Sequence, residues 1–287
     1  MGIDAKTVAE LRKMTGLPMM KCKKALQEAD GDIDVAADNL RKAGVKASEK
    51  VAARELMEGL VFVHQDGGGV CAVSVMCQTD FVAKSDDVVA FGEKLAADLF
   101  KNAPKDQGTN DDLAGYKLED GTDLKDQWDQ FALKMGENIK VGAFARFVPE
   151  NGLVTVYKHH NDRIAAVVEF DGAGIADNDA VAELGKQIGM QISFQKDVQS
   201  LDDSGIDPAW IEKEKEIFLA QVQDMPEDKR AMIADGKLKK RLKDVVLLDM
   251  PFIMNDKVSV KQQVEAVAKD AGAEMSIKRF ARIGAGA

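Results

Sequence analysis

The stretch CQTDFVAK, residues 77–84, lies where a β-strand ends and a helix has not yet begun. Before it, apolar and mixed positions alternate, and one face carries Cys71, Val73, Val75 and Cys77. After it, Ser85 fits the N-cap of a helix with an apolar stripe that begins at Val88. Phe81 therefore falls on a short connection, and we expect its ring to point outward. A ring folded back over the sheet edge is the alternative.

The body of the chain around this stretch reads as two copies of one plan. In each copy two strands form a hairpin, helices follow, and a third strand returns. The predicted strands of the first copy are residues 60–64, 70–77 and 140–147, and those of the second are 153–157, 164–170 and 277–283. Each copy would be a small antiparallel sheet covered by helices, so we predict an α+β fold.

The second copy contains an insertion at about residues 205–243. Residues 208–222 form a charged helix with only a narrow apolar stripe, and Asp224-Met225-Pro226 turns the chain into a second helix. So narrow a stripe covers one partner helix but not a broad core. We predict a helical hairpin that projects from the body.

The first 54 residues have the pattern of three short helices. Gly31 and Asp32 interrupt the helical spacing, and Gly44 is expected to end the third helix. Residues 47–57 then form a charged linker or helix. The predicted domains are 1–54, 55–148 and 149–287, and the first resembles a ubiquitin-associated domain.

Composition and charge restrict the function. Hydrophobic residues make up 45% and charged residues 31%, as in ordinary globular proteins. The net charge of −10 argues against nucleic acid as the main ligand, and no apolar run is long enough to span a membrane. Three scattered cysteines fit a reducing compartment rather than a disulfide framework. We therefore expect a cytoplasmic protein, with neither nucleic acid nor a membrane as its partner.

The chain offers little for catalysis. Its only histidines, at 64, 159 and 160, have no metal-site spacing, and no phosphate-binding loop is present. Neighbouring carboxylates such as Asp86-Asp87 are explained by helix starts and turns. We expect no enzyme activity, no metal and no cofactor. Met19-Met20 is more informative, because adjacent helical residues face different directions and one of the two should be exposed.

Several segments resemble the elongation factor Ts family. Thr79-Asp80-Phe81-Val82-Ala83-Lys84 resembles one signature of that family, and residues 11–26, LRKMTGLPMMKCKKAL, resemble its amino-terminal signature. Residues 31–36 and 251–254 are similar to further family segments. Ser74 and Met76 depart from the residues often found before the cysteine. Because the sequence ends soon after residues 279–283, we expect it to lack the further carboxy-terminal helices of some relatives.

The resemblance implies a guanine-nucleotide exchange factor that binds elongation factor Tu and promotes GDP release without binding nucleotide itself. It implies that Phe81, with Asp80 beside it, wedges into the GTPase domain near its magnesium and phosphate site. The other positions that the resemblance places at the partner are Arg12, Met19, Met20, Lys23, His159, Ile253 and Met254. Without the resemblance, His159 is interpreted as a polar group at a strand end, and Met254 could equally be a core residue.

A second function stays open. The three-helix pattern of residues 1–54 also fits an adaptor that binds a ubiquitin-like protein. In that case the first domain alone would bind, whereas nucleotide exchange would require the whole chain.

Overall fold

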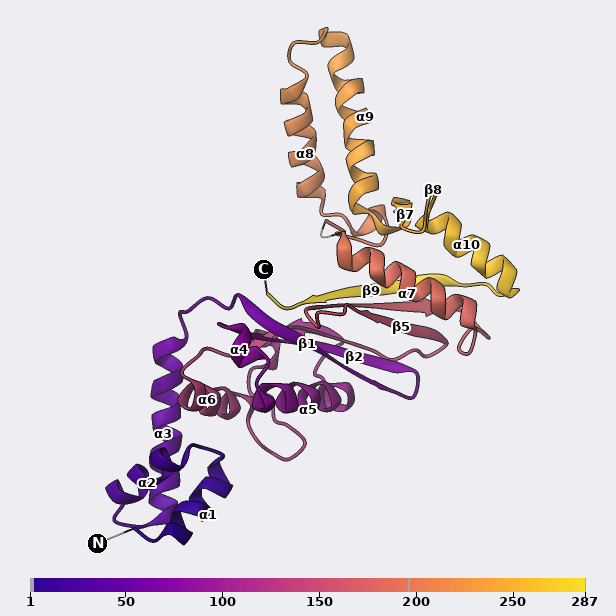
Figure 1. Ribbon diagram of the computed structural model, residues 1–287. Helices are drawn as coiled ribbons and strands as arrows, with labels where there is room; N and C mark the ends of the chain where they lie inside the picture. Colours follow the sequence, from indigo (N-terminus) through magenta and orange to yellow (C-terminus); the bar gives the residue numbers. More distant parts are fainter. Residues whose placement is uncertain (1–2, 196, 287) are drawn as a thin grey trace. The chain divides into compact units, whose positions relative to one another are not determined.

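The computed structural model describes residues 3–195 and 197–286 of the chain (Figure 1). Met1 and Gly2, at the start of the first predicted domain, and Lys196 and Ala287, in the third, lie outside the described residues. The described residues form helices α1 to α10 and three small sheets with antiparallel pairing, which confirms the predicted α+β class. None of the described helices is long and apolar enough to cross a membrane.

The chain divides into two compact units. The first consists of Met1–His64, Cys71–Arg146 and Ile283–Ala287, and the second of Gln65–Val70 and Phe147–Arg282.

Most residues of a four-stranded sheet of order β1-β2-β4-β3 belong to the first unit, whereas Gln65–Val70, at the β1–β2 turn, is assigned to the second. The strands of this sheet are β1 (Glu58–Asp66), β2 (Gly69–Cys77), β3 (Gln107–Thr109) and β4 (Lys140–Phe147). Gly67 and Gly68, with φ of 52° and 80°, make the two-residue turn between β1 and β2, a backbone that favours glycine. The short strand β3 was not predicted, because its three residues have no alternation to detect.

Three helices come between the strands of this sheet in the sequence. They are α4 (Asp80–Ala83), α5 (Asp86–Asn102) and α6 (Leu124–Met135). The predicted face of β2, with its two cysteines, is buried in one core with α5 and α6. In that core the ring of Phe91 meets the rings of Trp128 and Phe131 edge to face.

The chain begins with three helices, α1 (Ala5–Thr15), α2 (Met19–Glu28) and α3 (Ile33–Val51), which share an apolar core. The prediction that Gly44 ends the third helix is wrong, because α3 continues through it to Val51. Gly44 is buried where α3 packs along α6, and a Cβ there would lie 3.1 Å from the carbonyl oxygen of Asp129. Gly44 therefore allows α3 and α6 to pack closely and does not mark the end of a helix.

The second unit contains a three-stranded sheet of order β5-β6-β9, with α7 (Asp179–Phe194) packed on β5 and β6. The strands are β5 (Gly152–Lys158), β6 (Ile164–Asp171) and β9 (Ser276–Gly284), and the hairpin β7 (Pro251–Phe252) and β8 (Asn255–Ser259) precedes α10 (Val260–Ala271).

Helices α8 (Pro208–Gln221) and α9 (Glu227–Val245) of the second unit lie side by side and extend away from its sheet (Figure 1). Only a few apolar side chains are covered between them, among them Val222, Ala234 and Leu238.

Candidate functional site

Phe81 lies on α4, a single helical turn that follows β2 directly. Its side chain is 84% exposed, the largest fraction among the exposed large hydrophobic residues that the structure describes. The prediction that the ring points outward is confirmed. The prediction that it lies on a non-helical connection is wrong, because Thr79 caps a short helix by accepting a hydrogen bond from the Val82 N–H.

Polar contacts and one buried residue hold this turn in place. Glu137 accepts hydrogen bonds from both the main chain and the hydroxyl of Thr79, and the Ser85 hydroxyl donates to the Val82 carbonyl. Ala83 is buried in the core of the first unit. Asp80 is paired with Lys84 at 3.1 Å. The ring of Phe81 therefore takes little part in holding its own turn.

Cys71 and Cys77 lie in the core behind this turn and are inaccessible to solvent. Burial raises the pKa of each thiol to about 12. The negative charge of Glu137 acts in the same direction on the pKa of Cys77. The thiols therefore stay protonated near neutral pH and are suited to packing rather than nucleophilic chemistry.

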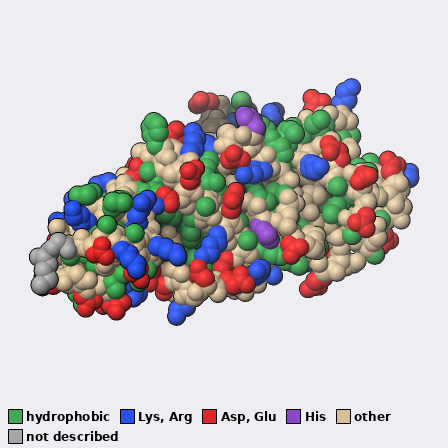
Figure 2. All heavy atoms as spheres, turned by 60° about the horizontal axis from the view of Figure 1, so that its bottom comes forward, with side chains coloured by type: hydrophobic (Ala, Val, Ile, Leu, Met, Phe, Trp, Pro, Cys, Tyr) green, Lys and Arg blue, Asp and Glu red, His purple; other side chains and the backbone are tan. Residues whose placement is uncertain are grey.

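A second group of predicted residues lies on the first two helices. Met19 and Met20, at the start of α2, are 54% and 71% exposed, so both are exposed rather than one of them. The reason is that the buried face of α2 begins only at Cys22. Arg12 on α1 and Lys23 on α2 are exposed as well. At the left of Figure 2, Lys and Arg side chains and hydrophobic side chains lie close together on the surface.

Ile253 and Met254 form the turn between β7 and β8 and are 40% and 59% exposed. A buried side chain holds this turn. The amide of Gln191 on α7 donates to the Pro251 carbonyl and accepts from the Ile253 N–H, both at 3.0 Å. The alternative that Met254 is a core residue is therefore wrong, because it stands at an exposed hairpin tip.

His159 follows β5, and its Nδ1 lies 3.0 Å from the Tyr157 hydroxyl. Its ring meets that of Phe194 edge to face at 5.3 Å and that of His160 at 4.1 Å. Phe194 is 58% exposed in the last turn of α7, which also carries Gln191. This end of α7 therefore connects His159 with the turn of Ile253 and Met254.

Phe194 was missed by the sequence reasoning, although a signal existed. It lies well off the stripe of Val181, Leu184, Ile188 and Ile192 that α7 buries. An aromatic residue away from the buried stripe of its helix is a candidate contact residue. Glu137 and Gln191 were also missed, and their roles depend on contacts with residues distant in the sequence.

The predicted positions divide between the two units. Arg12, Met19, Met20, Lys23, Asp80 and Phe81 belong to the first unit, and His159, Ile253 and Met254 to the second.

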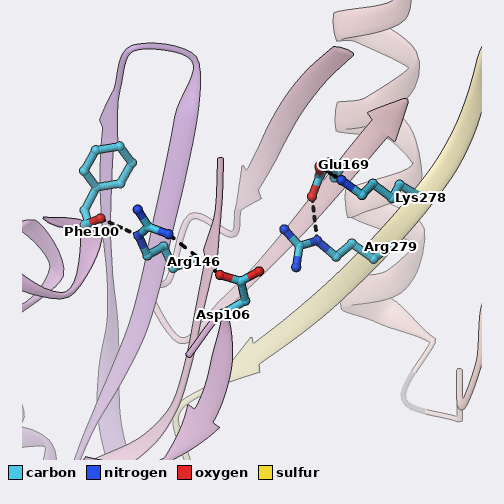
Figure 3. Close-up of polar contacts among 6 residues, drawn as sticks. All are labelled: Phe100, Asp106, Arg146, Glu169, Lys278 and Arg279. Atoms are coloured by element: carbon cyan, nitrogen blue, oxygen red, sulfur yellow. Dashed lines mark hydrogen bonds and ion pairs between the residues drawn. The ribbon is translucent and has the colours of Figure 1, made fainter. Parts of the chain in front are cut away.

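Ion pairs lie at the sheets of both units (Figure 3). In the first, Arg146 donates to the Phe100 carbonyl and pairs with Asp106. In the second, Glu169 is 1% exposed and accepts hydrogen bonds from Lys278 and Arg279, and the bond from Lys278 raises the pKa of that lysine. Both carboxylate oxygens of Glu169 are occupied, so it is not available as a general base.

No group of three or more His, Cys, Asp or Glu side chains is placed to hold a metal ion among the described residues. The exposed positions described above carry aromatic, methionine, isoleucine and basic side chains, whereas Asp80 and His159 are half-buried. Such surfaces bind proteins by burying aromatic and sulfur-containing side chains.

Comparisons with known proteins identify the family of the chain. The family model described as Elongation factor TS matches residues 78–287, beginning one residue before Thr79. The chain is 37% identical to elongation factor Ts of Desulfovibrio desulfuricans, over 98% of this chain and 97% of that protein. It is 36% identical to elongation factor Ts of Clostridium acetobutylicum, over 98% and 91%. For that of Paraburkholderia phymatum the identity is 38%, over 97% and 89%. Each match extends over most of this chain and of the relative, so the chain belongs to the elongation factor Ts family.

Proposed function

We propose that this chain binds elongation factor Tu during translation elongation and accelerates the release of its GDP. Membership of the elongation factor Ts family supports the proposal. The observation that carries it is Phe81, a ring that is 84% exposed on a turn held by other residues.

Thermodynamic linkage explains how binding promotes release. A protein that binds the empty GTPase more tightly than the loaded one weakens nucleotide affinity by the same factor, because the two bindings form one cycle. GTPases hold nucleotide largely through Mg²⁺ and the phosphate-binding loop. Phe81 acts as a wedge that displaces this site, and Asp80 lies beside it. A large aromatic ring buries much apolar area with few torsions to order, which suits an anchor residue.

Contacts at separated places stabilise the displaced state. Arg12, Met19, Met20 and Lys23 contact the GTPase domain through α1 and α2. His159, Ile253 and Met254 contact the partner through the second unit. Exposed methionines adapt their shape to a partner surface at low cost.

The domain layout is part of the same proposal. Residues 1–54 form a domain like ubiquitin-associated domains, and 55–148 and 149–287 are two related subdomains, the second with the helical hairpin inserted at about 205–243. The chain acts in the cytoplasm as a binding protein, without making or breaking covalent bonds and without binding nucleotide or nucleic acid itself. Only the three-helix pattern supports the alternative of an adaptor for a ubiquitin-like protein.

The test follows fluorescent GDP leaving a bacterial elongation factor Tu. The wild-type chain should accelerate release, and Phe81→Ala should reduce that acceleration by about tenfold or more, because an anchor residue is lost. Met225→Ala is the control, since Met225 is 49% exposed between α8 and α9. Unchanged release with Phe81→Ala would refute the wedge. No acceleration by the wild-type chain would refute the exchange function.

A further inference from the structure

The turn that carries Phe81 is held by one carboxylate in the loop after α6. Glu137 Oε1 accepts the Thr79 hydroxyl hydrogen at 2.7 Å, and Oε2 accepts the Thr79 main-chain N–H at 3.1 Å. Both hydrogen-bond donors of Thr79 therefore bind the side chain of Glu137. Hydrogen bonds to an ionised acceptor are stronger than those between neutral groups.

This carboxylate also orients the helix cap. Because the Thr79 hydroxyl gives its only hydrogen to Glu137, its oxygen is left to accept from the Val82 N–H at 3.3 Å. A helix of four residues does not form by itself, since nucleation costs more than one turn returns. The direction of α4 therefore depends on Glu137, on the buried Ala83 and on Ser85.

Asn138, the residue after Glu137, connects the segment before α4 to the end of α3. Asn138 is 5% exposed, and its side-chain amide donates to the carbonyls of Ala52 and Arg54 at 3.2 and 3.3 Å. Its main-chain N–H donates to the side-chain oxygen of Gln78 at 2.9 Å. Arg54 donates to the Gly136 carbonyl at 3.1 Å. Residues 136–138 thus join the end of α3 to the two residues that precede α4.

The ring of Phe81 has little contact of its own, so its position is whatever these bonds impose. An anchor that is held before binding loses less entropy when it enters its partner. A displacement of about 1 Å at a reacting centre costs up to about a hundredfold in rate. A wedge at a nucleotide site is expected to be similarly sensitive.

We infer that Glu137 and Asn138 are positioning residues for nucleotide release, forming a clamp that fixes Phe81 and couples it to the three amino-terminal helices. The inference rests on the proposed function, since it assumes that Phe81 displaces the nucleotide site. The clamp makes two predicted contact surfaces, Phe81 and the helices α1 and α2, parts of one rigid arrangement.

The first arm of the test needs no partner. Amide hydrogen exchange of the full chain is compared for wild type, Glu137→Gln and Glu93→Gln. Glu93 is exposed on α5, and its replacement makes the same charge change away from the clamp. The amides of Thr79 and Val82 should exchange about tenfold faster in Glu137→Gln and at the wild-type rate in Glu93→Gln. Unchanged exchange in Glu137→Gln would overturn the clamp.

The second arm measures GDP release from elongation factor Tu as a function of the concentration of this chain. Glu137→Gln should lower the maximal rate by about tenfold and change the half-saturating concentration by less than about threefold, because the other contacts are intact. The double variant Phe81→Ala with Glu137→Gln should release GDP no more slowly than Phe81→Ala alone, since a clamp has nothing to position once the ring is gone.

The outcomes separate the two proposals. Wild-type acceleration with additive effects of Phe81→Ala and Glu137→Gln would overturn the clamp while the exchange function stands. A wild-type chain without acceleration would overturn the exchange function and, with it, the positioning role. The amide exchange data would then still show whether Glu137 holds the turn. Asn138→Asp keeps the shape but replaces the amide nitrogen, which donates both hydrogen bonds, with an acceptor oxygen, and it should resemble Glu137→Gln in both arms if the clamp is correct.

Discussion

Strand β2 and the turn α4 follow each other in the chain, but the apolar side chains of β2 are buried whereas the ring of Phe81 on α4 is exposed. Cys71, Val73, Val75 and Cys77 of β2 are inaccessible, whereas Phe81 of α4 is 84% exposed. Helices α5 and α6 contribute to the core that covers the first group, while the turn is held largely by hydrogen bonds to Thr79 and Val82. An apolar side chain stabilises a fold only where others cover it. An exposed ring on a turn that other residues hold in place is available to contact a partner.

The largest expected difference lies between two phenylalanines of the first unit. Phe144 in β4 is 1% exposed, so Phe144→Ala should lower the free energy of unfolding by about 3–5 kcal/mol. Phe81→Ala should change it by less than about 0.5 kcal/mol. Urea denaturation of both variants measures the two values. A loss of several kcal/mol with Phe81→Ala would place that ring in the core and remove the contrast.

The two cysteines of β2 give a smaller effect of the same kind. Replacing both Cys71 and Cys77 by alanine should lower the free energy of unfolding by about 1–3 kcal/mol, because two buried sulfur atoms lose their contacts. GDP release per folded molecule should stay near the wild-type rate. Slower release by a fully folded double variant would instead give a thiol a direct part in function.

The same thiols predict a dependence on alkaline pH. Their pKa is raised to about 12 by burial, while an exposed thiol ionises near 8.5–9. Above pH 9 the unfolded chain binds fewer protons at these positions than the folded chain, so stability falls as pH rises toward 12. The fall between pH 9 and 11 should be shallower in the double alanine variant. Equal slopes would show that the thiols are not protected when the chain is folded.

The smallest effect is expected at the tip of the β7–β8 hairpin. Met254→Ala should change the free energy of unfolding by less than about 0.5 kcal/mol and weaken binding to elongation factor Tu. Met250, 2% exposed and four residues earlier, is its control, and Met250→Ala should cost about 2–5 kcal/mol. Thermal melting and titration with the partner separate the two cases. Similar stability losses in both variants would mean that the hairpin tip is packed.

The local elements were largely predictable. Strand β2, the turn at Gly67 and Gly68, and the helix start after Ser85 each depend on neighbouring residues, and the structure has all three. Both faces of β2 are largely buried, however, and the Ser85 side chain makes no capping hydrogen bond. The outward direction of Phe81 followed from the same pattern. The helix through Gly44 was not predictable, since glycine ends a helix on local grounds and only the packing of α3 along α6 gives it another use.

The sequence by itself determined the longer strands, most helices and the family, because these depend on periodicity, capping chemistry and short motifs, whereas the short strands β3, β7 and β8 were not predicted. The tertiary structure decided what holds the site. Glu137 meets Thr79 across 58 residues of sequence, and Gln191 meets Ile253 across 62. Contacts over such separations are stabilised only after helices and sheets have packed, since closing the intervening chain costs entropy that local pairs do not lose. No local pattern records them, and so the residues that position Phe81, Ile253 and Met254 emerged only from the fold.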